Sequence, residues 1–269
     1  MNSSGVSAIE LLKELADISD EISMSRYHAQ DLKIETKPDA TPVTDADRSV
    51  ETAIRKILSE KRPSDLIVGE EFGSPTEIDN GSSYWVIDPI DGTKNFLRGV
   101  PIWATLIALV NRDQTGKDNV VAGIVSAPAL FRRWYAALGF GAFTEVNGGP
   151  ATQISVSRVS SLSDASISFS DLAGWGERKE RYLNFLEKVW RVRGIGDFWS
   201  HMLVAEGAVD IAAEPKLALW DMAPLAIIVE EAGGIFTDFS GEVGPFGING
   251  ISANPLLHPK FLSALNGAN

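Results

Sequence analysis

One stretch of the chain decides the fold that the sequence predicts. Residues 85–96 read Trp-Val-Ile-Asp-Pro-Ile-Asp-Gly-Thr-Lys-Asn-Phe. An apolar run that ends in two aspartates and a Gly-Thr turn indicates a strand that presents two carboxylates and a free carbonyl at one edge of a sheet. If a helix begins at Thr93, its free N–H groups would face an anion such as phosphate, and Gly92 would let the backbone approach that anion closely.

Two helices and a set of short strands are predicted around this stretch. Apolar residues recur every three or four positions over residues 7–27, and a second apolar stripe follows a cap at Thr44 or Asp45. The segment 35–44 between them holds two prolines and is either a loop or an edge hairpin. Strands are expected at 66–68, 84–87, 103–110, 120–126 and 133–137, joined by turns that suit an antiparallel meander.

After residue 150 the predicted elements alternate between strand and helix. Strands are expected at 165–169, 191–193, 209–213 and 235–238, with helices at 177–189, 198–205 and 222–232. The sequence therefore predicts an α+β lobe over residues 1–150 and an α/β lobe over residues 151–269.

Composition excludes several classes of function. The chain has 36 acidic and 24 basic residues, a net charge of −12, and no cysteine. Without a long basic run, binding to nucleic acid or to an anionic membrane is not expected, and the acid excess favours cationic ligands.

The first ten residues lack the pattern of a secretory signal, and residues 100–110, the longest apolar stretch, are far short of the ~20 that a membrane helix needs. We therefore expect a cytoplasmic protein.

Further acids fall at the ends of predicted elements. Glu70 follows the strand at 66–68, and Asp221 precedes the helix at 222–232. Carboxylate and carbonyl oxygens are the ligands that Mg²⁺ prefers, and two divalent ions about 4 Å apart can cleave a phosphate ester without a protein nucleophile. Taken singly, each acid has a structural alternative: turn chemistry for Asp88 and Asp91, a solvated loop for Glu70, and a helix cap for Asp221.

Together these pieces resemble the inositol monophosphatase family of Mg²⁺-dependent phosphomonoesterases. The matching segments run in family order from about residue 6 to residue 260, and they comprise 44–47 with 50–51, 69–71, 85–96, and 220–224 with 230–234. The resemblance implies an αβαβα layered sandwich of the inositol monophosphatase and fructose-1,6-bisphosphatase type. It also implies a homodimer.

The resemblance implies a metal site and a catalytic group. The residues expected to hold Mg²⁺ are Glu70, Asp88 and the carbonyl of Ile90 for one ion, and Asp88, Asp91 and Asp221 for a second. A third, weakly held ion near Glu70 is also implied, so two or three ions are expected. Glu70 and Thr93 would activate the attacking water, and Asp47 would support Thr93. The expected substrate-binding residues are Asp91, Gly92, Thr93, Lys94, Asp197 and Glu214.

Within the family, the likeness is greatest to the bacterial histidinol-phosphate phosphatases. It rests on residues 37–47, on Lys94, on residues 100–106 and on 196–210. Asp197 and Glu214 would face the organic half of the substrate, and two acids suit the ammonium and imidazole of L-histidinol better than a neutral polyol. Asp197 also fits a cap for the helix at 198–205. The expected reaction is hydrolysis of L-histidinol phosphate, with inositol monophosphate or another small phosphate ester as the alternative.

Other classes fit the sequence less well. Haloacid dehalogenase-type phosphatases place one residue between their two aspartates, whereas two residues separate Asp88 from Asp91. A Ser-His-Asp hydrolase is disfavoured because no Gly-x-Ser-x-Gly elbow occurs and no histidine falls in a site element. A binding protein that has lost turnover would lack some of the ligands, and none is missing.

Overall fold

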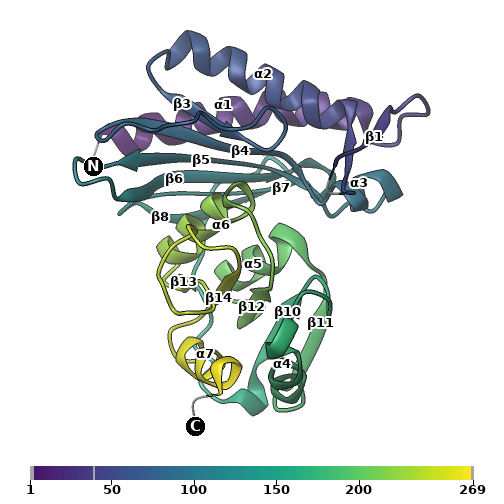
Figure 1. Ribbon diagram of the computed structural model, residues 1–269, viewed down its shortest axis with the longest axis vertical. Helices are drawn as coiled ribbons and strands as arrows, with labels where there is room; N and C mark the ends of the chain where they lie inside the picture. The colour runs from purple at the N-terminus through teal and green to yellow at the C-terminus, as the bar shows by residue number, and fades with distance from the viewer. Residues whose placement is uncertain (1–2, 39, 268–269) are drawn as a thin grey trace.

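Helices and sheets alternate in five layers (Figure 1). The computed structural model describes residues 3–38 and 40–267. Its helices are α1 (Ser3–Arg26), α2 (Asp45–Lys61), α3 (Thr93–Arg98), α4 (Lys179–Leu186), α5 (Asp197–Ala205), α6 (Leu219–Glu231) and α7 (His258–Asn266). From top to bottom in Figure 1, the layers are α1 with α2, a large sheet, α5 with α6, a smaller sheet, and α4 with α7. The predicted αβαβα sandwich is confirmed.

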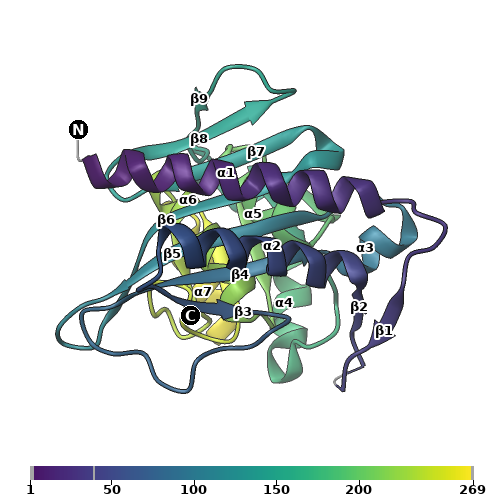
Figure 2. The ribbon, with the colours of Figure 1, turned by 90° about the horizontal axis from the view of Figure 1, so that it is seen from above.

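The large sheet contains the apolar run at residues 85–87 and the two aspartates that follow it. It has seven strands, which pair in the order β3-β4-β5-β6-β7-β8-β9. Their bounds are β3 (Leu66–Gly69), β4 (Ser83–Asp91), β5 (Ala104–Arg112), β6 (Asp118–Ala127), β7 (Arg132–Ala137), β8 (Gly141–Val146) and β9 (Thr152–Gln153). Among the described strands of this sheet, only β3 and β4 pair in parallel. Helices α1 and α2 lie across one face of this sheet (Figure 2) and α6 packs on the other. Because both faces are covered, β4 is apolar and buried over nearly its whole length.

The smaller sheet is mixed and has the order β11-β10-β12-β14-β13. Its strands are β10 (Ser166–Phe169), β11 (Arg191–Gly194), β12 (Ile211–Glu214), β13 (Ile235–Thr237) and β14 (Gly250–Ala253). β10 lies between β11 and β12 and is parallel to both, so the carboxyl ends of three neighbouring strands meet at one edge. Trp134, Phe198 and Phe236 are fully buried in the core that the two sheets share with α5 and α6.

Local sequence explains where the second helix begins. Thr44 precedes α2 in an extended conformation, its hydroxyl accepts the backbone N–H of Ala46 and of Asp47, and Asp47 in return accepts the N–H of Thr44 at 2.9 Å. This reciprocal capping box fixes the first turn of the helix. Of the two predicted caps, Thr44 is therefore the correct one, and Asp47 is held rigidly at the helix start.

Of the two alternatives predicted for segment 35–44, the hairpin is confirmed, because β1 (Ile34–Thr36) pairs with β2 (Pro42–Thr44). Other elements depart from the prediction. Strands β8, β9 and β14, and helix α7, were not predicted. The helix expected at 177–189 is wrong in extent, because a 3₁₀ turn occupies Gly176–Arg178 and α4 ends at Leu186.

Strand β9 extends the large sheet to residue 153, and the division into two lobes near residue 150 stays a prediction. No helix in the described part of the chain is long and apolar enough to cross a membrane.

Candidate active site at the carboxyl ends of two sheets

The end of β4 turns two aspartates toward one cavity. The pairing of β4 with β5 shifts register between Asp88 and Asp91, and this irregularity brings both residues to the sheet edge. Asp88 accepts the backbone N–H of Ile90 at 2.9 Å, and Asp91 accepts that of Phe198, the second residue of α5, at 2.7 Å. Each carboxylate is therefore oriented by a backbone donor. The predicted helix start at Thr93 is confirmed by α3, with Gly92 before it at φ 84°.

A third carboxylate comes from the middle helical layer. Asp221 lies in the first turn of α6 and accepts the N–H of Ala218 at 2.8 Å. Asp88, Asp91 and Asp221 each offer one carboxylate oxygen, and these three oxygens lie within 4.8 Å of one another. A compact, largely buried set of hard oxygen donors fits a divalent cation such as Mg²⁺ or Mn²⁺. The structure thus brings three of the predicted metal ligands together.

The electrostatics of these carboxylates agree with a cation site. Burial, followed by the charges of Glu70 and Asp91, raises the pKa of Asp88 well above its usual value. Burial and the charges of Asp197 and Asp221 do the same for Asp91. Burial also raises the pKa of Asp221 to about 6, although its bond from Ala218 partly opposes the shift. Clustered buried acids of one sign resist ionisation unless a cation joins them.

The stability of the metal-free protein is expected to fall as pH rises. Because the folded-state pKa of Asp221 is raised from 3.8 to about 6, the folded protein retains a proton that the unfolded chain releases, and this favours folding only at low pH. Asp88 and Asp91 shift in the same direction. For Asp221 alone the full loss is on the order of 3 kcal/mol, most of it between about pH 4 and about pH 6. The part lost from about pH 5 to about pH 7.5 is about 1.4 kcal/mol, or a fall in Tm of roughly 3–5 °C.

Thermal unfolding in chelator, measured by circular dichroism across that pH range, tests this expectation. Millimolar Mg²⁺ should raise Tm strongly at the upper pH and little at the lower one, because protonated carboxylates bind cations poorly. A metal-free Tm that is unchanged over the range would contradict the expected linkage.

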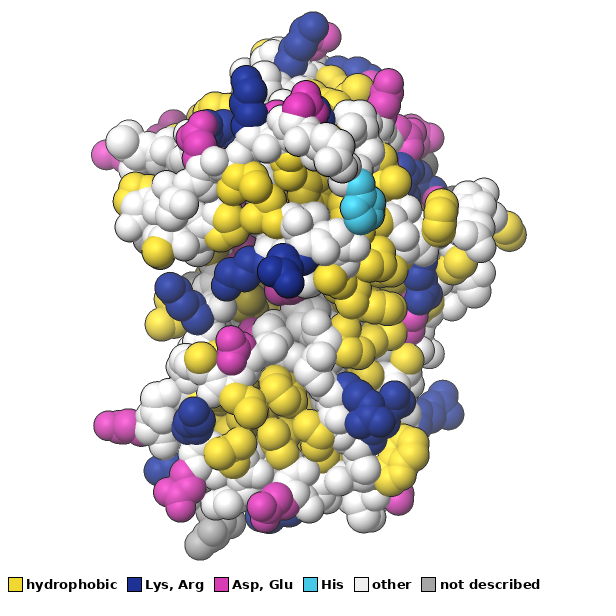
Figure 3. Space-filling model, turned by 90° about the vertical axis from the view of Figure 1, so that its right-hand side faces the viewer, with side chains coloured by type: hydrophobic (Ala, Val, Ile, Leu, Met, Phe, Trp, Pro, Cys, Tyr) yellow, Lys and Arg dark blue, Asp and Glu magenta, His cyan; other side chains and the backbone are white. Residues whose placement is uncertain are grey.

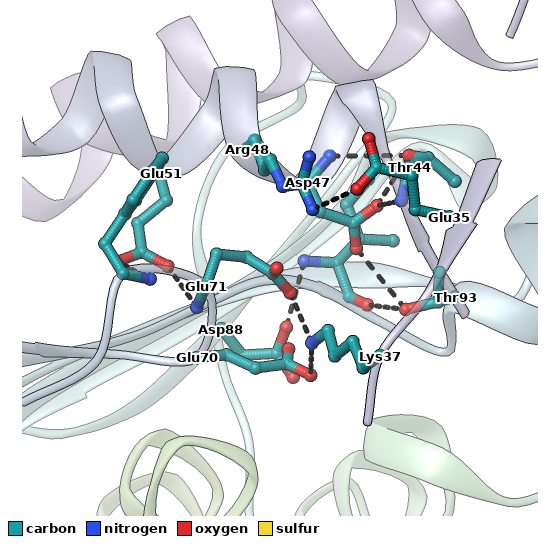
Figure 4. Close-up of polar contacts among 12 residues, drawn as sticks. Glu35, Lys37, Thr44, Asp47, Arg48, Glu51, Glu70, Glu71, Asp88 and Thr93 are labelled. Carbon is teal, nitrogen blue, oxygen red and sulfur yellow. Dashed lines mark hydrogen bonds and ion pairs between the residues drawn. The ribbon is translucent and has the colours of Figure 1, made fainter. Parts of the chain in front are cut away.

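Glu70 reaches the same cavity from β3 and is held by a lysine. β3 runs parallel to β4, so the loop that follows β3 lies beside the end of β4. Lys37 Nζ, from the hairpin, donates to Glu70 Oε1 at 2.7 Å and to Glu71 Oε1 at 2.5 Å (Figure 4). Burial works against the charge of Lys37, but its bonds to these two carboxylates prevail and raise its pKa. The Lys37 ammonium therefore neutralises part of the acidic cluster.

Thr93 and Asp47 form the connection that the resemblance implied. Thr93 Oγ1 lies 3.4 Å from Asp47 Oδ1 and 3.0 Å from the carbonyl oxygen of Ile90 (Figure 4). Burial raises the pKa of Asp47, although the Thr44 hydroxyl and N–H stabilise its charged form. The capping box of α2 thus aligns a buried acid with the first residue of α3.

A second group of polar residues lines the other side of the cavity. They follow the three parallel strands of the smaller sheet, with Ser170 after β10, Asp197 beyond β11 and Glu214 at the end of β12. Glu214 Oε1 accepts the N–H of Ser170 at 2.7 Å and its hydroxyl at 2.6 Å, and the N–H of Asp197 donates to Ser170 Oγ at 3.0 Å. Burial raises the pKa of Glu214 to about 7 and that of Asp197 to about 6. Ser170 therefore links the two predicted selectivity residues.

Asp197 does not cap its helix. Gly196 occupies the cap position, and Asp197 is the first helical residue, with a left-handed φ of 51° that a non-glycine residue rarely adopts. Its Oδ2 accepts Asn95 Nδ2 at 2.9 Å, which joins α5 to α3. Strained backbone of this kind is typical of functional sites. The side chain is thus directed to the cavity rather than to the helix terminus.

The cavity has two adjoining parts. One, of about 410 Å³, contains the metal-site carboxylates, and the other, of about 450 Å³, lies between Glu214 and Leu225. The residues common to both parts are Thr41, Asp91, Lys94, Ser170, Asp171, Asp197 and Asp221. Figure 3 shows Lys or Arg side chains beside a hollow on this side of the molecule, between its upper and lower halves.

All predicted site residues fall in or beside this cavity, and several other lining residues were not predicted. Glu70, Asp88, Ile90, Asp91, Gly92, Thr93, Lys94, Asp197 and Asp221 line the first part, Glu214 lines the second, and Asp47 contacts Thr93. Ser170, Asn95 and His201 were missed as site residues. His201 lines the second part although it is buried, and burial lowers its pKa to about 4. In the sequence, Ser170 is marked only by its position directly after an apolar strand.

Comparison with known proteins agrees with this geometry. The model of the inositol monophosphatase family matches residues 7–268. The chain belongs to the inositol monophosphatase family. Among solved structures of the family's fold, the extragenic suppressor protein SuhB from Bartonella henselae superimposes with a TM-score of 0.85, at 30% identity over 98% of this chain and 100% of that chain.

Two curated members of the family share about half of their residues with this chain. A histidinol-phosphatase from Mycobacterium tuberculosis is 53% identical over 254 residues, 94% of this chain and 95% of that protein. A histidinol-phosphatase from Streptomyces coelicolor is 52% identical over 260 residues, 96% of both chains. The likeness therefore extends over nearly the whole length of the family fold.

Proposed function

We propose that this protein is a histidinol-phosphatase that hydrolyses L-histidinol phosphate to L-histidinol and phosphate. The observation that carries the proposal is a carboxylate cluster that could hold metal ions and that lies next to a second, acid-lined cavity. The full-length likeness to two proteins named histidinol-phosphatase supports the same substrate. In this proposal the reaction belongs to histidine biosynthesis.

The metal is proposed to be Mg²⁺, with two or three ions per site. Glu70, Asp88 and the carbonyl of Ile90 would hold one ion, and Asp88 would share a second with Asp91 and Asp221. A third would lie near Glu70. Divalent ions bound there would offset the negative charge of the phosphate and lower the pKa of a water molecule. The proximity and burial of the aspartates support this assignment.

The remaining chemistry is assigned to the chain's own side chains. Glu70 is proposed to accept the proton of the attacking water, as a carboxylate within reach of the phosphate can do. Thr93 would orient that water through its hydroxyl, which Asp47 and the carbonyl of Ile90 hold in place. The backbone N–H groups at the start of α3 and the ammonium of Lys94 would bind phosphate oxygens. These assignments follow the predicted catalytic and substrate-binding residues.

Substrate choice is proposed to come from Asp197 and Glu214. L-Histidinol carries an ammonium and an imidazole, and both can donate charge-assisted hydrogen bonds to carboxylates. A polyol phosphate would leave these two acids without a cationic partner, at a cost in binding. The alternative function, hydrolysis of inositol monophosphate or another small ester, uses the same metal site. The raised pKa values of both acids in the ligand-free cavity indicate that a cation there would be stabilising.

Parallel assays of phosphate release test substrate and metal together. L-Histidinol phosphate and inositol 1-phosphate would be compared with Mg²⁺ and with a chelator. We expect kcat/KM for histidinol phosphate to exceed that for inositol phosphate by at least ~100-fold, because the polyol would leave buried acids without their hydrogen-bond partners. Equal or higher kcat/KM on inositol phosphate would reject the substrate, and full turnover in chelator would reject the metal.

Replacement of Asp197 by alanine tests the selectivity assignment. Loss of one charge-assisted contact should reduce kcat/KM for histidinol phosphate by roughly 10- to 100-fold, while a generic aryl phosphate should be hydrolysed at a rate within a few-fold of wild type. A Ser163→Ala variant, on the exposed turn before β10, provides a control that should change neither rate. Equal losses on both substrates would assign Asp197 to the general chemistry instead.

The homodimer and the cytoplasmic location stay predictions. Light scattering of the purified protein would measure its mass directly, and a monomer at working concentrations would contradict the first of them.

A further inference from the structure

Glu51 is a buried carboxylate that no proposed chemical step uses. It lies on the inner face of α2, its side chain is 0% exposed, and it does not line the cavity. Its Oε2 accepts the backbone N–H of Glu71 at 2.8 Å (Figure 4). Its Oε1 accepts Arg55 Nε at 2.8 Å and, more distantly, the N–H of Phe72 at 3.4 Å. Glu51 therefore binds the loop that carries Glu70.

The same loop is fastened at its base. Gly69 and Gly73 exchange two backbone hydrogen bonds of 3.1 Å, and Arg55 Nη2 donates to the carbonyl of Gly73 at 3.1 Å. A Cβ at Gly69 would lie 1.9 Å from Glu51 Oε1, so the carboxylate packs directly on this glycine and any larger residue there would displace it. Glu51 and Arg55 together contact both ends of the loop and its middle.

Burying a carboxylate is favourable only if its oxygens are fully paired, and an apolar side chain at the same place would avoid that cost. Unlike an apolar side chain, the carboxylate accepts hydrogen bonds, and these bonds fix the orientation of the groups that donate them. It fixes the peptide N–H groups of two successive residues, Glu71 and Phe72, immediately after Glu70. On its other side, the N–H of Glu70 donates to the carbonyl of Ile87 on β4 at 3.2 Å. The backbone of Glu70 is thus held between α2 and β4.

We propose that Glu51, supported by Arg55, is a positioning residue that aims the Glu70 carboxylate at the reaction site. This inference rests on the role proposed above for Glu70. A reacting group that moves by about 1 Å loses on the order of 100-fold in rate, so loosening the loop acts on turnover. Substrate affinity depends on Lys94, Asp197 and Glu214, which Glu51 does not contact.

The test uses the full-length protein with Glu51→Gln and Glu206→Gln as a matched pair. Glu206 also pairs with an arginine, Arg132, accepts the ring N–H of Trp134 at 2.6 Å and lies outside the cavity. We expect Glu51→Gln to lower kcat by about 10-fold or more with KM within about twofold, and to accelerate amide hydrogen exchange over residues 66–78. Glu206→Gln should alter thermal stability without either effect.

Arg55→Lys provides a second variant in case Glu51→Gln does not fold. It keeps a cation beside Glu51 but lacks the second guanidinium nitrogen, which donates to the Gly73 carbonyl. We expect a smaller fall in kcat and the same faster amide exchange over residues 66–78. Unchanged hydrogen exchange at 66–78, or a kcat loss no larger than that of Glu206→Gln, would overturn the inference. Exchange is measured without substrate, so it tests the positioning role even if histidinol phosphate proves not to be hydrolysed.

Discussion

Asp88→Asn is expected to abolish turnover and, at the same time, to stabilise the metal-free protein. Asp88 is 2% exposed and has Glu70, Asp91 and Asp221 around it. In the proposed arrangement it contributes charge to two metal ions, so its loss should reduce kcat at least ~1,000-fold. Without metal, the same change removes one of several repelling buried charges, and Tm at neutral pH should rise by several degrees.

The matched control for this variant is Asp210→Asn. Asp210 is also buried, at 5% exposure, but it accepts the N–H of Ser166 at 2.6 Å and the hydroxyl of Ser157, and it belongs to no carboxylate cluster among the described residues. Its amide variant should lose stability and keep its kcat. Steady-state rates and metal-free melting curves of both variants decide the matter. An active Asp88→Asn, or one that melts earlier than wild type without metal, would contradict the proposed site.

Glu70→Gln is expected to produce the second largest loss, about 100- to 10,000-fold in kcat, with KM nearly unchanged. A glutamine keeps the size of the side chain and can still accept the bond from Lys37, but it cannot take up a proton from water. The effect should therefore fall on turnover rather than on substrate binding.

The neighbouring residue supplies the control for Glu70. Glu71 shares the same lysine, at 2.5 Å, but does not line the cavity. Glu71→Gln should leave kcat within a few-fold of wild type. Equal losses in the two variants would show that the lysine contact, rather than proton transfer by Glu70, is what turnover requires. Single-turnover measurements with L-histidinol phosphate would separate the chemical step from product release.

The residues that line the cavity could be predicted from the sequence more completely than the helices and strands around them. Asp88, Asp91 and Glu70 follow apolar strands, and a change of pattern from strand to turn is visible in a single sequence. The carboxyl ends of neighbouring parallel strands meet, so residues distant in the chain converge at one edge. Ser170 and Asn95 were missed because each acts through a partner, Glu214 or Asp197, whose position only the folded sheet order reveals.

The missed elements share a physical cause. β14 is a four-residue strand that starts at a glycine and is buried between β12 and β13, so its identity comes from its partners rather than from alternation. Helix α7 begins at His258 and Pro259, and its short apolar face is packed on α4. The hairpin at 34–44 was one of two predicted alternatives, and the ion pairs of Lys37 with Glu70 and Glu71 that stabilise it are contacts that local propensity does not encode.

The two sides of the cavity come from different parts of the gene. Apart from Asp221, the residues assigned to hydrolysis precede residue 100, whereas Ser170, Asp197 and Glu214 follow three strands of the smaller sheet. Under the proposed assignment, we expect mutations that reshape those three strand ends to change which alcohol is accepted and to leave the phosphate chemistry intact. A lineage would then acquire new substrates in small steps that each preserve hydrolysis.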